Sequence, residues 1–287
     1  MKFLFSMAGC CLVLAPMVSA QVSVELMLEQ DQFLAGESVP VAVRITNFSG
    51  QTLHLGKDSD WLCFSVEGRD NYLVPTTGDV PVQGEFEVQS SSVATHRVDL
   101  APYFALTRPG RYVVTATVKL KDWDKELASK PKSLDVIAGT KLWEQEVGVP
   151  GAAGQPPEVR KYALQQAIHL KQMKLYVRVT DQAESRVIGV FPIGPLISFS
   201  SPEHQIDKES NLHVLYQTGA KTFNYSVVNP NGRLLVRQTY EYTDTRPGLR
   251  VDREGRIFIG GGARRVSSDD LPPPDDTSTH DAKTPRP

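Results

Sequence analysis

Apolar and polar side chains alternate along most of this sequence, and the alternating runs end at Gly, Pro, Asn or Asp. In "LTRPGRYVVTATVKL" (106–120), one face of an extended chain carries Tyr112, Val114, Ala116 and Val118. A strand has a side-chain period of two, whereas a helix needs a period of about 3.6 residues. Such runs at intervals of about ten residues are typical of antiparallel β proteins. We therefore predict an all-β chain.

Residues 21–139 carry the clearest strands and are expected to form one domain. The runs "QVSVELML" and "VPVAVRITN" alternate as residues 106–120 do, and "KSLDVIAG" supplies a last strand. Leu106, Gly110 and Tyr112 resemble a tyrosine corner, in which a phenol closes a loop onto the backbone. We expect an N-terminal immunoglobulin-like β-sandwich over residues 21–139.

Two motifs of this half, FxAGESVPVAVRITN and LTRPGRYVVTATV, are similar to those of immunoglobulin-like domains in bacterial exported proteins. The group includes macroglobulin-type modules and a proteinase-inhibitor type of sandwich. The resemblance implies a sandwich fold. It transfers no functional residue, because fold and function are separable.

The second half contains an internal repeat. The segment "QIDKESNLHVLYQTGAK" (205–221) matches "RVDREGRIFIGGGAR" (250–264), with Asp207 over Asp252 and Glu209 over Glu254. A spacing of about 40 residues is typical of propeller blades, but a closed propeller needs about four blades or more. Residues 159–266 are therefore expected to form a C-terminal antiparallel β domain of propeller-like hairpin repeats. An incomplete propeller and a second sandwich both fit, and either would pack against the first domain.

Three further segments complete the expected organisation. Residues 140–158 end in "GVPGAAGQPPE", which is rich in Gly and Pro and predicts a linker. Residues 158–174 have a helix-forming composition, whereas the repeat favours a strand, and both interpretations stay open. Residues 267–287 are nearly free of apolar side chains and predict a disordered tail.

The first twenty residues have the anatomy of a secretory signal peptide. Lys2 precedes a short apolar run, and small residues at positions 18–20 predict cleavage before Gln21. No later segment approaches about 18 continuous apolar residues, so we expect no transmembrane segment in the mature chain. The protein is expected to be secreted or periplasmic. The alternative is a lipid anchor through Cys10, which follows a weak lipobox.

The charge of the chain bears on its partners, and its cysteine content bears on disulfide formation. The chain has 31 basic and 33 acidic residues, a formal net charge of -2, and no basic block, which argues against nucleic acid. Only Cys63 remains after removal of residues 1–20, so no internal disulfide is expected. We expect a macromolecular partner, a protein, whose identity the sequence does not give.

No recognisable catalytic or cofactor-binding constellation is found in the sequence, so no enzyme activity and no cofactor is predicted. His204, Asp207, Glu209 and His213 lie close enough in sequence to consider a metal site. We interpret them as turn and strand residues, because zinc ligands must converge on one point and this spacing does not require it. No metal site is predicted.

The leading functional hypothesis is a secreted, non-enzymatic interaction or structural protein of the cell envelope or extracellular space. Aromatic side chains would concentrate its binding energy, and the candidate binding residues are Trp61, Trp123, Tyr240 and Tyr242. One alternative is a proteinase inhibitor that uses the loop "VPTTGDVPVQGE" (74–85). The other is a carboxylate-dependent hydrolase whose acids meet from distant strands.

Overall fold

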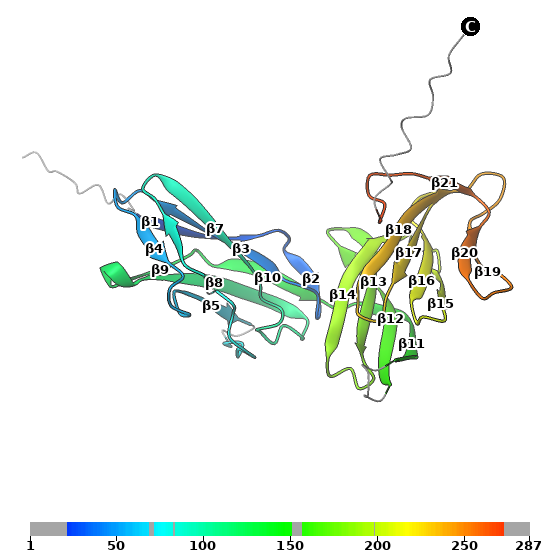
Figure 1. Ribbon diagram of the computed structural model, residues 1–287, viewed down its shortest axis with the longest axis horizontal. Coiled ribbons are helices and arrows are strands. Elements are labelled where there is room, and N and C mark those ends of the chain that lie inside the picture. The colour runs from blue at the N-terminus through cyan, green and yellow to red at the C-terminus, as the bar shows by residue number, and fades with distance from the viewer. Residues whose placement is uncertain (1–21, 69–71, 83, 151–156, 198, 273–287) are drawn as a thin grey trace, which may run out of the picture.

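The computed structural model describes residues 22–68, 72–82, 84–150, 157–197 and 199–272, and in them the chain is all-β (Figure 1). The strands form antiparallel sheets, with one parallel pairing between β2 and β10. No helical segment in this part of the chain has the length and apolar character required to span a bilayer. The predicted fold class is confirmed. The finer immunoglobulin-like and propeller-like assignments stay predictions.

The first unit, residues 22–137, encloses one apolar core between two main sheets. One sheet has the order β1-β3-β7, with β1 (Val22–Leu28), β3 (Pro40–Asn47) and β7 (Ser92–Asp99). The other has the order β2-β10-β8-β5, with β9 also paired to β8. Its strands are β2 (Gln32–Leu34), β5 (Leu62–Glu67), β8 (Gly110–Leu120), β9 (Lys125–Ala128) and β10 (Lys132–Ile137). A two-stranded ribbon, β4 (Leu53–Leu55) with β6 (Phe86–Val88), and a short 3-10 turn, η2 (Lys121–Trp123), complete the unit.

The alternation in β8 positions its side chains as the sequence predicts. Tyr112, Val114, Ala116 and Val118 are all buried in the first core. The Tyr112 hydroxyl donates to the Arg108 carbonyl at 2.8 Å, so the predicted closure of the loop by the phenol is present. This bond satisfies the only polar group that the tyrosine brings to the edge of the core.

The second unit stacks three β layers. The junction sheet follows chain order: β11 (Thr140–Val149), β12 (Glu158–His169), β13 (Gln172–Asp181) and β14 (Val187–Pro195). The middle sheet contains β15 (Glu203–Ile206), β16 (Leu212–Gln217), β17 (Thr222–Val228), β18 (Leu234–Glu241) and β21 (Ala263–Arg265). The outer hairpin consists of β19 (Gly248–Val251) and β20 (Ile257–Gly260).

Two separate cores hold these layers together. Between the junction and middle sheets, Tyr162, Leu175 and Tyr216 belong to one buried cluster. Between the middle sheet and the outer hairpin, Phe223 and Leu249 belong to another. The middle sheet therefore buries apolar side chains on both faces, and each layer depends on its neighbour for cover.

The repeat noticed in the sequence is a repeat of turn chemistry. Asp207, Asn229 and Asp252 each begin a hairpin turn in which the side-chain Oδ1 accepts the backbone N–H four residues later, at 2.8–2.9 Å. The residue before that donor has a left-handed backbone in each turn, with φ between 64° and 81°. Asp and Asn favour this geometry because their side chains mimic a backbone acceptor. The match of Asp207 with Asp252 thus marks two equivalent hairpins.

The expected linker is a strand over most of its length. Residues 140–149 form β11, which pairs with β12 from Thr140 to Val149 and buries Val147. The Gly and Pro residues that suggested a linker follow this strand, and positions 151–156 lie outside the described residues. The second unit therefore begins at Thr140 and not at residue 159.

Residues 158–174 are strand, which settles the open choice between helix and strand. They form β12 and the start of β13, joined by a two-residue turn. Tyr162 and Leu164 face the same core, as a period of two requires. Strand partners on both sides of β12 override its helix-forming composition.

The first residues of the expected disordered tail are ordered. Asp270 is buried and accepts from the Arg264 guanidinium at 2.7 Å. Leu271 and Arg237 exchange backbone hydrogen bonds at 2.7 and 2.9 Å. The buried ion pair and this bridge fix residues 267–272 against β18. Residues 273–287, like the expected signal peptide at 1–20, lie outside the described residues.

We predict that a fragment spanning residues 140–272 unfolds in one sharp thermal transition, whereas 158–272 does not. Removal of β11 takes Val147 from the core and leaves the 12-residue β12 as an unpaired edge. Circular dichroism melting of the two fragments checks this. A sharp transition in the shorter fragment would show that β11 is dispensable.

We also predict that the double substitution Leu170→Asn/Lys171→Gly stabilises the protein by about 1–2 kcal/mol, because glycine at position 171 removes the cost of one side chain in a left-handed backbone. Leu170 and Lys171 have φ of 48° and 67° in the β12–β13 turn, where Asn-Gly is the preferred pair. Urea denaturation measures the change. The single substitution Leu170→Ala, which keeps the strain, is expected to give no gain.

Candidate functional site

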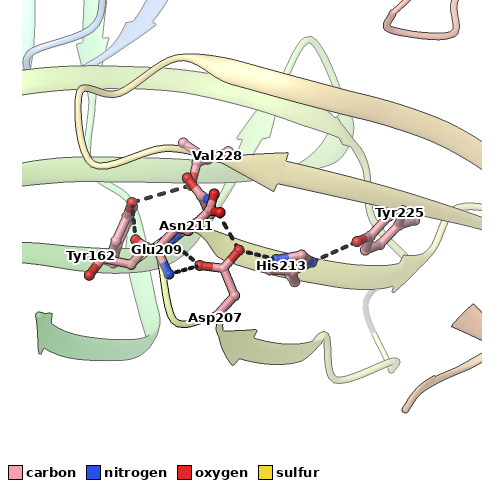
Figure 2. A network of polar contacts seen from close by, with 8 residues as sticks. Tyr162, Asp207, Glu209, Asn211, His213, Tyr225 and Val228 are labelled. Carbon is pink, nitrogen blue, oxygen red and sulfur yellow. Dashed lines mark hydrogen bonds and ion pairs between the residues drawn. The ribbon is translucent and has the colours of Figure 1, made fainter. Parts of the chain in front are cut away.

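The densest polar cluster in the second unit surrounds Asp207, at the turn that follows β15 (Figure 2). Its Oδ1 accepts the backbone N–H groups of Glu209 at 2.9 Å and Asn211 at 2.8 Å. Its Oδ2 lies 2.9 Å from the Asn211 amide nitrogen and 3.0 Å from His213 Nε2. One carboxylate thus bonds to the turn backbone, to the Asn211 side chain and to His213 of β16.

His213 also contacts Tyr225 of the neighbouring strand β17. The distance between His213 Nδ1 and the Tyr225 hydroxyl is 2.6 Å. Burial acts to raise the pKa of Asp207, but hydrogen bonds from His213 and Asn211 outweigh it and hold that pKa below its usual value. The ionised carboxylate can only accept, so His213 Nε2 carries a proton. In the neutral imidazole, Nδ1 then accepts from the Tyr225 hydroxyl.

Tyr162 extends the cluster into the junction sheet. Its hydroxyl lies 3.0 Å from the Ser210 carbonyl in the β15–β16 turn and 3.2 Å from the Val228 carbonyl at the end of β17. Burial raises the pKa of Tyr162 and raises that of Tyr225 to about 12, so both phenols stay protonated at neutral pH. These bonds connect the junction sheet, the 207–211 turn and strands β16 and β17 of the middle sheet.

Of the four side chains considered for a metal, only Asp207 and His213 come together. His204 stacks on Trp143, with ring centroids 4.2 Å apart, and Glu209 reaches only the Asn211 amide, at 3.4 Å. Within the described residues, no three His, Cys, Asp or Glu side chains converge as metal ligands would. The sequence spacing could not show the Tyr225 contact, because that contact depends on how β16 pairs with β17.

We predict that Asp207→Asn lowers the free energy of unfolding by about 2 kcal/mol at pH 7, the scale of hydrogen bonds to a charged group. Because the folded pKa of Asp207 is depressed, its contribution is present above the ordinary Asp pKa of 3.8 and is lost as the pH falls below it. The difference between wild type and variant should therefore shrink in acid. Urea titrations at several pH values measure it.

The equivalent turn supplies the matched control. Asp252→Asn makes the same exchange of carboxylate for amide in an exposed turn, where the Asp252 side chain has Arg256 and not a histidine as its partner. We expect a smaller loss of stability from it. Equal losses from the two substitutions would contradict the role given to His213.

The two units meet through a small apolar cluster. Leu34 of the first unit packs with Ala167, Tyr176 and Val190 of the junction sheet. Two polar contacts flank it: Arg178 donates to the Ala35 carbonyl at 2.8 Å, and the Leu170 N–H donates to the Gln32 side chain at 3.1 Å. The expected packing of the second half against the first is present here.

A groove of about 350 Å³ runs beside this junction, with Phe104 and Val190 among its apolar residues. Two carboxylates line it. Asp99 accepts from the Val39 N–H at 2.7 Å, and Glu37 accepts from the Leu34 N–H at 2.7 Å. Burial raises the pKa of Glu37. Both acids thus accept hydrogen bonds from local backbone. The carboxylate-dependent hydrolase stays a prediction.

The tip of the β12–β13 hairpin exposes two large aliphatic side chains at the same junction. Ile168 is 62% exposed and Leu170 is 61% exposed. Leu170 also occupies the left-handed backbone described above. We call these two side chains the junction tip. An exposed apolar pair on a strained turn is a feature that folding alone does not favour.

The four predicted binding residues lie in four different environments. Trp61 is 2% exposed and its Nε1 donates to the Val82 carbonyl, so its ring is part of the first core and is not available to a partner. Trp123 packs partly against the same core. Tyr240 is partly buried beneath the Arg264 guanidinium. Only Tyr242, at 42%, is well exposed.

The loop proposed for proteinase inhibition is attached at both ends. Val74 and Val82 are buried in the first core, and the Thr77 N–H donates to the Tyr103 carbonyl at 2.9 Å. Residues 75–79 between these anchors are exposed, and position 83 lies outside the described residues. Proteinase inhibition stays a prediction.

Comparisons with known proteins found weak structural likeness and no family match. No family model matches the sequence, and no curated protein matches it. Among solved structures, the sporulation control protein Spo0M from Bacillus subtilis is similar, with a TM-score of 0.32 and 11% identity, over 59% of this chain and 83% of that protein. A likeness at this level carries no argument about fold or function.

Proposed function

We propose that this is an exported, non-enzymatic interaction protein of the cell envelope or extracellular space, which binds a partner protein at the junction tip. The observation that carries the proposal is the pair Ile168 and Leu170, exposed together on a strained turn. Polar or glycine residues would make this turn more stable. A residue that lowers the stability of an exposed turn, where another residue would raise it, is characteristic of a site under functional constraint.

The surroundings of the tip support a role in binding. The tip lies where the two units meet, and the Leu170 N–H donates to the side chain of Gln32 of the first unit. The apolar side chains are therefore presented from a supported turn and not from a free loop, which lowers the entropy cost of binding. The Asp207 cluster, in contrast, is fully engaged in holding strands together.

A photo-crosslinking amino acid at position 170 of the full-length protein tests the proposal in its native host. We expect a covalent adduct of higher mass when the probe replaces Leu170, and its loss when Ile168→Asp is added. The matched control places the probe at Phe48, which is 64% exposed on the first unit. Adducts of equal yield at positions 170 and 48, or adducts unaffected by Ile168→Asp, would contradict a specific site.

The turn substitution Leu170→Asn/Lys171→Gly separates binding from folding. We expect this variant to be more stable than wild type and yet to capture less of the crosslinked partner when the probe is at position 168. A variant that is stabilised and captures the partner equally well would show that the strain serves no interaction.

A further inference from the structure

The outer hairpin has the fewest strands of the three layers in the second unit and is the last of them. The junction and middle sheets contain four and five strands, whereas this layer contains only β19 and β20 (Figure 1). One side of the hairpin is held: the Leu249 N–H donates to Glu203 of β15 at 2.9 Å, and Lys208 donates to the Glu254 carbonyl at 2.5 Å. The first bond lies on the β19 side and the second at the turn of the hairpin, which leaves β20 as the other edge.

The register of the hairpin shows which backbone groups that edge presents. The Asp252 N–H donates to the Arg256 carbonyl at 3.0 Å, so 252 and 256 form a bonded pair. In an antiparallel ladder bonded and non-bonded pairs alternate. The pair of Arg250 with Phe258 is therefore bonded, and Ile257 and Ile259 direct their N–H and C=O groups away from β19. The outward N–H of Leu249, opposite Ile259, agrees with this assignment.

These outward groups of Ile257 and Ile259 have no hydrogen-bond partner among the described residues. The two edges of the junction sheet, β11 and β14, carry features that block strand addition. β11 has a bulge between Lys141 and Trp143, and β14 carries Pro192 and two register shifts. Bulges and prolines are the usual means of blocking strand addition. β20 has neither.

The side chains beside this edge are basic and apolar. Phe258 is 47% exposed and lies opposite Arg250 on the outer face of the hairpin. Arg250 and Arg253 form no ion pair with any described residue, whereas Arg256 is paired with both nearby acids. A segment that adds here would meet unpaired positive charge around an exposed aromatic ring.

We propose that the β20 edge accepts an extended segment of a partner protein as a third strand, and that this segment alternates acidic with apolar residues. The backbone of the segment pairs with Ile257 and Ile259, and its acidic side chains meet Arg250 and Arg253. Strand addition of this kind draws affinity from main-chain bonds and specificity from alternate side chains. The surface is separate from the junction tip and does not depend on it.

Fluorescence anisotropy with the full-length protein tests this, using a labelled seven-residue peptide of alternating Glu and Val as the probe. We expect it to bind and the equivalent Lys and Val peptide to bind at least tenfold more weakly. Arg250→Glu/Arg253→Glu should reverse that preference. Equal affinity for the two peptides, or no binding of either, would overturn the proposal.

Two proline substitutions locate the bound strand. Ile257→Pro removes an N–H from the open edge and is expected to abolish binding. Val251→Pro is the matched control, because Val251 pairs with Ile257 and its N–H lies on the β19 side. It perturbs the same hairpin and should leave binding unchanged. If both variants lost peptide binding equally while circular dichroism showed them folded, the effect would belong to the hairpin as a whole. That result would refute edge addition.

Sedimentation of the protein alone distinguishes a second copy from another protein. We expect a monomer at the concentrations used for peptide binding. A dimer that Ile257→Pro dissociates would show that a second copy occupies the edge, which would overturn the assignment of a different partner.

Discussion

The turn from Asp207 to Asn211 is the point on which the second unit depends, because it is bonded to both neighbouring layers. Tyr162 of the junction sheet donates to the Ser210 carbonyl of this turn. Lys208 of the same turn donates to the Glu254 carbonyl of the outer hairpin. Asp207 sets the shape of the turn and, through His213, fixes it to the middle sheet. A single ionised carboxylate thereby positions three layers whose cores are otherwise separate.

The three β layers of the second unit have different environments at their two ends. At one end, Leu34 of the first unit covers Tyr176 and Val190 of the junction sheet. At the other end, strand β20 of the outer hairpin pairs only with β19, and its second side has no strand partner among the described residues. Stacked β layers bury apolar surface against neighbours, so an end without a full neighbour retains groups that can still be paired. A partner strand is the simplest way to complete that end.

Local patterns in the sequence were sufficient for strands and turns and insufficient for contacts between strands. Alternation identified β8, and the internal repeat identified the match of Asp207 with Asp252, since both depend on neighbouring residues alone. Trp61 was selected as a surface residue, yet its burial depends on Val82, which is distant in the chain. The contact of His213 with Tyr225 likewise needs the β16–β17 register. The strand β11 was missed because the Gly and Pro residues after it resembled a linker.

The junction tip and the β20 edge share a physical property that identifies them among many exposed positions. At each, a simple change would stabilise or protect the chain: Asn-Gly in place of Leu170 and Lys171, or a proline or bulge in β20. The protein uses such devices elsewhere, in the bulge of β11 and the positive-φ Gly232 and Gly255 of its other turns. Left-handed φ occurs at other non-glycine residues as well, but among those described Leu170 is the only apolar one. Places where local rules are broken without structural compensation are where interaction is expected.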